Sequence, residues 1–112
     1  MSAEQTKTTI SRYFDLMGQG ADFSECCAPD VTWLVADTGE VIEGRERVRD
    51  YIVALHSSMV DARTRTLVVA DDNVFLEGDC AALVVGARTR YCVAYDISGE
   101  LITAMRGYGI DL

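Results

Sequence analysis

The spacing of apolar residues changes along this chain, and that change limits the folds open to it. Two early segments carry an apolar stripe at helical spacing, formed by Ile10, Tyr13, Phe14 and Met17 and by Val48, Ile52, Leu55 and Met59. From residue 64 onward, short β-branched and aromatic runs are separated by turn residues, which is typical of antiparallel strands. Helices followed by a strand meander predict a two-layer α+β domain.

The turn and cap residues place the boundaries of the expected elements. Asp22 is typical of a helix N-cap and Pro29 of a helix stop, so a short helix is expected between them. The third helix is expected over about 45–58. Strands are expected over 31–35, 41–42, 64–76, 81–87, 91–97 and 101–108, with turns at 37–40, 77–79 and 98–99.

Size, composition and charge narrow the classes of partner. The chain has 112 residues, of which 49% are hydrophobic, so residues 1–112 are expected to form one domain with a real core. A net charge of −8 disfavours nucleic acid and anionic membranes as partners. No apolar run approaches the roughly 20 residues that span a bilayer, and the first residues are polar, so a cytoplasmic protein is expected.

The cysteines and the histidine give no sign of a metal. The four cysteines have no zinc-ligand spacing, and we expect reduced, mostly buried thiols. The single histidine has no carboxylate pattern around it that specifies a metal site. Neither a metal nor a cofactor is therefore expected. A strongly twisted sheet curls around helices and leaves a hollow, so the expected partner is a small, apolar molecule.

Several short strings together resemble a known family. They are 12–14 (Arg-Tyr-Phe), 20–23 (Gly-Ala-Asp-Phe), 28–31 (Ala-Pro-Asp-Val), 42–46 (Ile-Glu-Gly-Arg-Glu) and 98–102 (Ser-Gly-Glu-Leu-Ile). In order and spacing they resemble the nuclear transport factor 2-like superfamily, in its SnoaL-like branch near ketosteroid isomerases. The resemblance implies a cone-shaped, curled antiparallel sheet wrapped around three helices, enclosing a pocket. It also implies a homodimer packed through the sheet.

The resemblance carries only part of the isomerase machinery over to this chain. Tyr13 matches the tyrosine that binds the oxyanion in ketosteroid isomerases, although it also belongs to the apolar stripe. The position of the basic aspartate falls at Val35, and that of the second oxyanion acid falls at Tyr91. The paired aspartates and arginine of limonene epoxide hydrolases are absent at the matching steps, so direct epoxide hydrolysis is not expected.

Two residues are candidates for the missing base. Asp37 lies two residues beyond Val35, on the same face of a strand, but it also begins a turn-like string. His56 is the side chain best suited to proton transfer near neutral pH, although it also lies near a helix end, where a surface or capping role is common. The sequence leaves both alternatives open.

The strand pattern also names the expected pocket wall. Tyr91, Val93 and Tyr95 share one face of a strand, and Met105 shares a face with Gly107, whose missing side chain would widen the cavity or mark a bulge. The predicted wall comprises Trp33, Val35, Tyr95, Met105 and Gly107. Arg88 and Arg90 are expected to flank a turn and to solvate it, with steering of an anionic substrate as the alternative.

These residues support one leading hypothesis and two alternatives. The leading hypothesis is a cofactor-free enzyme that isomerises, cyclises or dehydrates a small apolar carbonyl compound. Asp37 or His56 would move a proton, and Tyr13 with Tyr91 would hold the oxyanion. The alternatives are a non-catalytic binding protein with the same pocket and a dimeric assembly domain, since fold alone does not give a function.

Overall fold

The computed structural model describes residues 2–84 and 87–110, and side chains 82–84 are left out of the description. Two α-helices, one short 3-10 helix and six strands make up the fold. In chain order these are α1 (Ala3–Gly18), η1 (Phe23–Cys26), β1 (Cys27–Val35), β2 (Glu40–Glu43), α2 (Arg45–Ser57), β3 (Arg63–Val69), β4 (Asn73–Val84), β5 (Ala87–Ser98) and β6 (Leu101–Tyr108).

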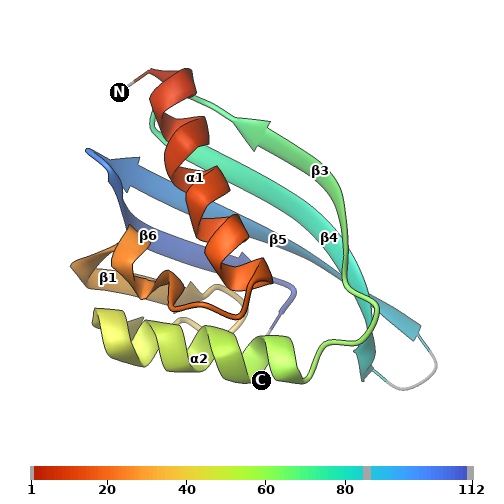
Figure 1. The fold of residues 1–112 in the computed structure, drawn as a ribbon. Coiled ribbons are helices and arrows are strands. Elements are labelled where there is room, and N and C mark those ends of the chain that lie inside the picture. Colours follow the sequence, from red (N-terminus) through yellow and green to blue (C-terminus); the bar gives the residue numbers. More distant parts are fainter. Residues whose placement is uncertain (1, 85–86, 111–112) are drawn as a thin grey trace.

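The strands form one six-stranded sheet in the order β2-β1-β6-β5-β4-β3. Both helices lie on the same side of this sheet, with α1 crossing its long strands and α2 running beside β1 and β2 (Figure 1). The long β3, β4 and β5 curl past the end of α1 (Figure 1). The inner face of the sheet and the two helices enclose the hydrophobic core, and the α+β class expected from the sequence is confirmed.

The two helices bury the faces that their apolar stripes predict. Ser2 caps α1 in a capping box with Gln5, and Ile10 and Tyr13 are fully buried. The stripe of α2 is buried as well, and consists of Val48, Ile52 and Leu55. Apolar periodicity therefore located both helices correctly.

The expected short second helix is only one turn of 3-10 helix. Asp22 does cap it, since its carboxylate accepts a hydrogen bond from the backbone N–H of Ser24 at 3.0 Å. However, the helix ends at Cys26, and Pro29 lies inside β1 beside a register shift between Cys27 and Thr32. Four residues before a proline-containing strand leave no room for an α-helix, so the prediction of three helices was wrong.

The sheet is mixed, because β1 and β6 pair in parallel while all other neighbours are antiparallel. In this pairing Trp33 lies beside Met105 and Val35 beside Gly107. The expected antiparallel pairing is confirmed for four of the five neighbouring pairs and is wrong for β1 with β6. The spacing of turns predicts the direction of pairing only for strands that follow one another along the chain. Between β1 and β6 lie more than half of the residues.

The string 77–79 lies within β4 and is not the turn that its glycine suggested. The chain turns earlier, where the backbone N–H of Ala70 donates to the carbonyl of Asn73 at 2.8 Å. Gly78 pairs with Thr64 on one side and Tyr91 on the other. A Cβ at Gly78 would lie 2.8 Å from Cε1 of Tyr91, so this glycine makes room for an aromatic ring.

Candidate functional site

A cavity of about 290 Å³ lies between the two helices and the β3–β5 part of the sheet. Most of its wall is apolar, and these side chains include Phe14, Met17, Ile52, Leu55, Leu76, Val93 and Ile110. Its exposed rim follows the end of α2 and the start of β3, at His56, Ala62, Arg63 and Thr64. The cavity is therefore apolar, with a partly polar entrance at this rim, which is the usual form of a small-molecule site.

Two tyrosines from β5 line this hollow. Tyr91 and Tyr95 are 9% and 5% exposed, and they lie on the same inner face of the strand. Neither hydroxyl makes a hydrogen bond to a residue that the structure describes. Burial raises the pKa of both phenols, so they stay protonated near neutral pH and remain able to donate to an acceptor.

His56 is the lining residue that changes charge near neutral pH. It lies in the last turn of α2 and keeps much of its surface exposed at the rim. Partial burial against the cavity wall lowers the pKa of its imidazole. The neutral imidazole is therefore the dominant form at pH 7, and a neutral imidazole can accept a proton. No Asp or Glu lines this cavity in the described part of the chain.

Tyr13 reaches the same hollow but is held among aromatic rings. It is 1% exposed, and its ring packs edge-on against Phe14, Phe23 and Tyr95 with centroid distances of 5.4, 5.3 and 5.9 Å. Its hydroxyl donates to Sδ of Met105 at 3.9 Å. Burial raises the pKa of this phenol as well. A thioether is a weak acceptor, so a ligand oxygen would be the better partner for this hydroxyl.

Asp37 lies outside the cavity. It is exposed, in the turn after β1, and its Oδ2 accepts a hydrogen bond from the backbone N–H of Gly109 at 3.0 Å. It therefore ties the β1–β2 turn to the end of β6. The structure does not bring Asp37 together with His56, Tyr91 or Tyr13.

The predicted pocket wall divides into residues that line the cavity and residues behind it. Trp33 and Tyr95 line it, whereas Val35 and Met105 are fully buried core side chains that do not. A Cβ at Gly107 would lie 2.6 Å from Cζ2 of Trp33. Gly107 thus makes room for the indole of Trp33.

Sequence reasoning missed the rim and one part of the wall. Met59 was assigned to the helix stripe, and Ala62, Arg63, Thr64 and Ile110 were not singled out at all. No local pattern marks them, because they reach the cavity only through the loop after α2 and the curl of the sheet. The stripe of α2 was the available signal, since it pointed Ile52 and Leu55 towards the same space.

A second hollow, of about 440 Å³, lies beside α1 and the β5–β6 turn. Its lining side chains include Gln5, Thr8, Arg12 and Glu100. Arg12 is already paired with Glu25 at 2.6 Å. This hollow is larger but holds no phenol or imidazole, so the chemistry favours the smaller cavity.

Two further classes of site were tested on the same residues. Among residues 2–84 and 87–110, no three His, Cys, Asp or Glu side chains gather as they would to hold a metal ion. In the same ranges, no helix has the length and hydropathy needed to cross a membrane.

Comparison with known proteins identifies the family. Residues 10–105 match the family model of the SnoaL-like domain. The chain belongs to the SnoaL-like domain family. No curated protein matches the sequence.

Solved structures agree on the fold. A steroid delta-isomerase from Pseudomonas aeruginosa superposes with a TM-score of 0.82 at 11% identity, over 93% of this chain and 78% of that one. An NTF2-like protein from Burkholderia xenovorans superposes at 0.75 with 17% identity, over 99% and 92%. A designed protein with a curved β-sheet superposes at 0.79 with 21% identity, over 99% and 88%. These identities are low, so they establish the SnoaL-like fold and leave the activity to the site.

Proposed function

We propose that this SnoaL-like protein is an isomerase-type enzyme that moves a proton within a small, apolar carbonyl compound, without a cofactor. One observation carries the proposal. His56 and the unpaired hydroxyls of Tyr91 and Tyr95 meet at one apolar cavity. A base and hydrogen-bond donors around an apolar space are the parts that enolate chemistry requires.

The proposed reaction uses each group in one role. Neutral His56 takes a proton from the carbon next to the substrate carbonyl, and the electron pair of that C–H bond moves towards the carbonyl oxygen. Tyr91 or Tyr95 donates a hydrogen bond to the resulting enolate oxygen. The imidazolium then returns the proton to a different carbon. The double bond shifts, no atom is lost, and the histidine is neutral again.

Cavity size favours a substrate of one or two rings. An engineered protein cavity of roughly 150 Å³ binds one benzene ring. The cavity here, about 290 Å³, is close to twice that volume. A four-ring steroid would need about twice as much space again, so we propose a more compact substrate than the one named for the steroid isomerase.

A β,γ-unsaturated ketone tests this chemistry directly. We expect conversion of 3-cyclohexen-1-one to 2-cyclohexen-1-one, followed by the ultraviolet absorbance of the conjugated product, and deuterium uptake when the reaction runs in D₂O. His56→Gln should lower kcat by about 10²-fold, the usual contribution of one general base. Tyr91→Phe and Tyr95→Phe should lower it as well, with the larger loss identifying the main donor.

Two variants decide between the candidate bases. Asp37→Asn should turn over at the wild-type rate, since Asp37 bonds the Gly109 backbone outside the cavity. If His56→Gln keeps full activity and Asp37→Asn loses it, Asp37 is the base and the assignment to His56 is wrong.

A binding protein without catalysis is the second candidate. The observation that favours it is that His56 makes no hydrogen bond to a described residue, so no carboxylate orients its ring. Under this alternative, a bound ketone would be recovered unchanged after long incubation in D₂O, with no deuterium incorporated. Any enzyme-dependent exchange at the carbon beside the carbonyl would exclude it.

We also propose that the protein acts as a homodimer in the cytoplasm. Val68 and Phe75 are register partners on the outer face of β3 and β4, and they are 50% and 41% exposed. Adjacent apolar side chains on an open sheet face suit a second copy of the chain. The four free cysteines suit a reducing compartment. Sedimentation should give a dimer that Phe75→Glu converts to a monomer, and a wild-type monomer would contradict the proposal.

A further inference from the structure

The entrance of the cavity is built on one short connection. Residues 58–62 join α2 to β3, and His56, Met59, Ala62 and Arg63, on or beside this connection, all line the cavity. At its centre, Asp61 has φ 52°, in the left-handed region that non-glycine residues seldom occupy. A connection bent in this way needs contacts from the rest of the protein to hold it.

Two bonds that do not involve Arg88 help to hold this connection: Nη2 of Arg63 donates to Oδ2 of Asp61 at 2.7 Å, and the backbone N–H of Ala81 donates to the carbonyl of Val60 at 2.8 Å. Arg88 on β5 adds further contacts. Its Nη1 donates to Oδ2 of Asp61 at 3.1 Å, and its Nη2 donates to the backbone carbonyl of Asp61 at 2.8 Å. Its Nε donates to Oδ1 of Asp79 on β4 at 2.5 Å. One planar guanidinium therefore joins the entrance connection to two strands of the sheet.

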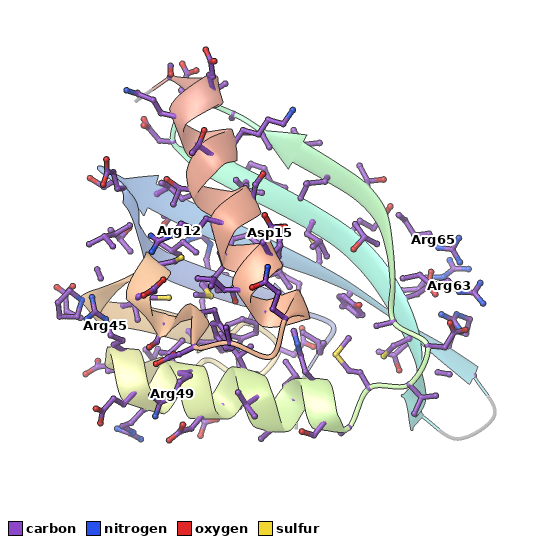
Figure 2. The ribbon with its side chains drawn as sticks, viewed as in Figure 1. Arg12, Asp15, Arg45, Arg49, Arg63 and Arg65 are labelled. Atoms are coloured by element: carbon purple, nitrogen blue, oxygen red, sulfur yellow. The ribbon has the colours of Figure 1, made fainter. Side chains whose placement is uncertain are left out.

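Asp79 anchors the guanidinium of Arg88 to the sheet. It is only 8% exposed, and its other oxygen accepts a hydrogen bond from Nε of Arg65 at 2.6 Å. Hydrogen bonds from Arg65 and Arg88 lower the pKa of Asp79 to about 2, so it stays charged at any ordinary pH. Figure 2 shows Arg63 and Arg65 at the start of β3, pointing away from the helices. The expectation that Arg88 flanks a turn and only solvates it was wrong.

We propose that Arg88 is a positioning residue that holds residues 58–62 against β4 and β5 and thereby limits access of small molecules to the cavity. Because it touches no cavity atom, it acts through the connection. The proposal rests on the proposed function only in treating this cavity as the ligand site. Whether residues 58–62 move away from β4 and β5 can be measured without knowing the ligand.

The chain contains a matched control. Arg106 on β6 also pairs with a carboxylate, through bonds of 2.7 and 2.9 Å from Nη1 and Nη2 to the two oxygens of Asp96. The side chains of Arg88 and Arg106 are similarly exposed, at 34% and 27%. Arg106 contacts neither the entrance connection nor the cavity, so Arg106→Ala removes a comparable ion pair without affecting the entrance.

Trp33 provides a readout that needs no ligand. It is the only tryptophan in the chain, it is buried, and it lines the cavity. Collisional quenching of its fluorescence by acrylamide therefore measures how often a small molecule enters. We expect Arg88→Ala to raise the bimolecular quenching constant about threefold or more, and Arg106→Ala to leave it at the wild-type value, with all variants folded by far-UV circular dichroism.

Two milder variants keep the test decisive if Arg88→Ala does not fold. Arg88→Lys keeps the charge but loses the planar guanidinium fork that reaches Asp61 and Asp79 at once, so quenching should still rise. Asp61→Asn keeps a residue that tolerates the left-handed region and should change quenching in the same direction. Equal quenching in all these variants and in wild type would overturn the proposal.

Turnover distinguishes the two proposals from each other. With 3-cyclohexen-1-one, Arg88→Ala should raise KM with little change in kcat, because the catalytic side chains are untouched. If the wild-type protein shows no turnover but Arg88→Ala still raises quenching, the proposed reaction fails and the role of Arg88 stands. If the wild-type protein turns over the ketone and Arg88→Ala leaves quenching unchanged, the proposed reaction stands and the proposed role of Arg88 fails.

Discussion

The inner face of the sheet has a filled half and a hollow half. In the filled half, on β1 and β6, Val35 and Met105 are sealed from solvent. In the hollow half, on β4 and β5, Leu76, Val93 and Tyr91 line open space. The two halves belong to one sheet and differ in how closely the helices cover them.

Two glycines show the same contrast within the strands. Gly107 in the filled half accommodates Trp33, and Gly78 in the hollow half accommodates Tyr91. In both positions a Cβ would fall within 2.8 Å of the aromatic ring. The ring over Gly107 completes a wall, whereas the ring over Gly78 carries a hydroxyl that no described residue binds. A strand glycine under an aromatic ring therefore supports packing in one half of the sheet and, in our proposal, catalysis in the other.

The largest expected effect comes from paired methionine truncations. Met105→Ala should lower the free energy of unfolding by about 2–5 kcal/mol, because it leaves a void in a closed core. Met17→Ala, at the cavity, should cost about 1 kcal/mol or less, because its side chain is already partly solvated. Chemical denaturation measures both. Equal losses would show that the two halves are packed alike.

Glycine substitutions should come next in size. Gly78→Ala and Gly107→Ala should each cost about 1–3 kcal/mol, because the added methyl group meets a ring or backbone that has little room to move. At temperatures where both remain folded, Gly78→Ala should impair turnover of 3-cyclohexen-1-one more than Gly107→Ala does. Gly78→Ala displaces Tyr91, a proposed hydrogen-bond donor, whereas Gly107→Ala displaces Trp33, which only forms part of the wall. A matching loss in Gly107→Ala would mean that the filled half also positions the site.

Removing phenol oxygens should have a smaller effect on stability. Tyr13→Phe gives up a hydrogen bond to Sδ of Met105 and should cost about 0.5–1 kcal/mol. Tyr95→Phe gives up no bond to the described protein and should leave stability within about 0.5 kcal/mol of wild type. Thermal denaturation checks the difference. A large loss in Tyr95→Phe would show that its hydroxyl is structural.

The smallest effect on stability should come from the protonation of His56. Its folded pKa is lowered from 6.5, so the stability it contributes is present above pH 6.5 and is lost as pH falls through the folded value. Activity should rise with pH through the same lowered pKa, because the base must be neutral. His56→Gln should remove this stability change. A pH–rate profile centred above 6.5 would point to a different base.

Local patterns predicted the elements well and their long-range pairing poorly. The stripes of α1 and α2 and the inward face of Tyr91, Val93 and Tyr95 follow from periodicity, which depends only on neighbours along the chain. Gly78 was misassigned to a turn because a glycine marks either a turn or a close approach, and only the ring of Tyr91 decides between them.

The candidate site was only partly accessible to the same reasoning. Tyr13, Tyr91, Tyr95, Trp33 and His56 all line the cavity, yet nothing in the sequence favoured His56 over Asp37 as the group near it. That choice depends on where the β1–β2 turn lies relative to the end of β6. The contacts of Arg88 depend in the same way on the curl of β3, β4 and β5.

The parallel pairing of β1 with β6 also affects how the protein is made. These strands lie near opposite ends of the chain, and the ribosome completes one long before the other. The strand pair that contains Trp33 and Met105 therefore forms last, after α2 and the β3–β5 meander have had time to form. Contacts between such distant segments slow folding and leave intermediates with exposed apolar surface. Until β6 emerges, one edge of β1 lacks its partner strand.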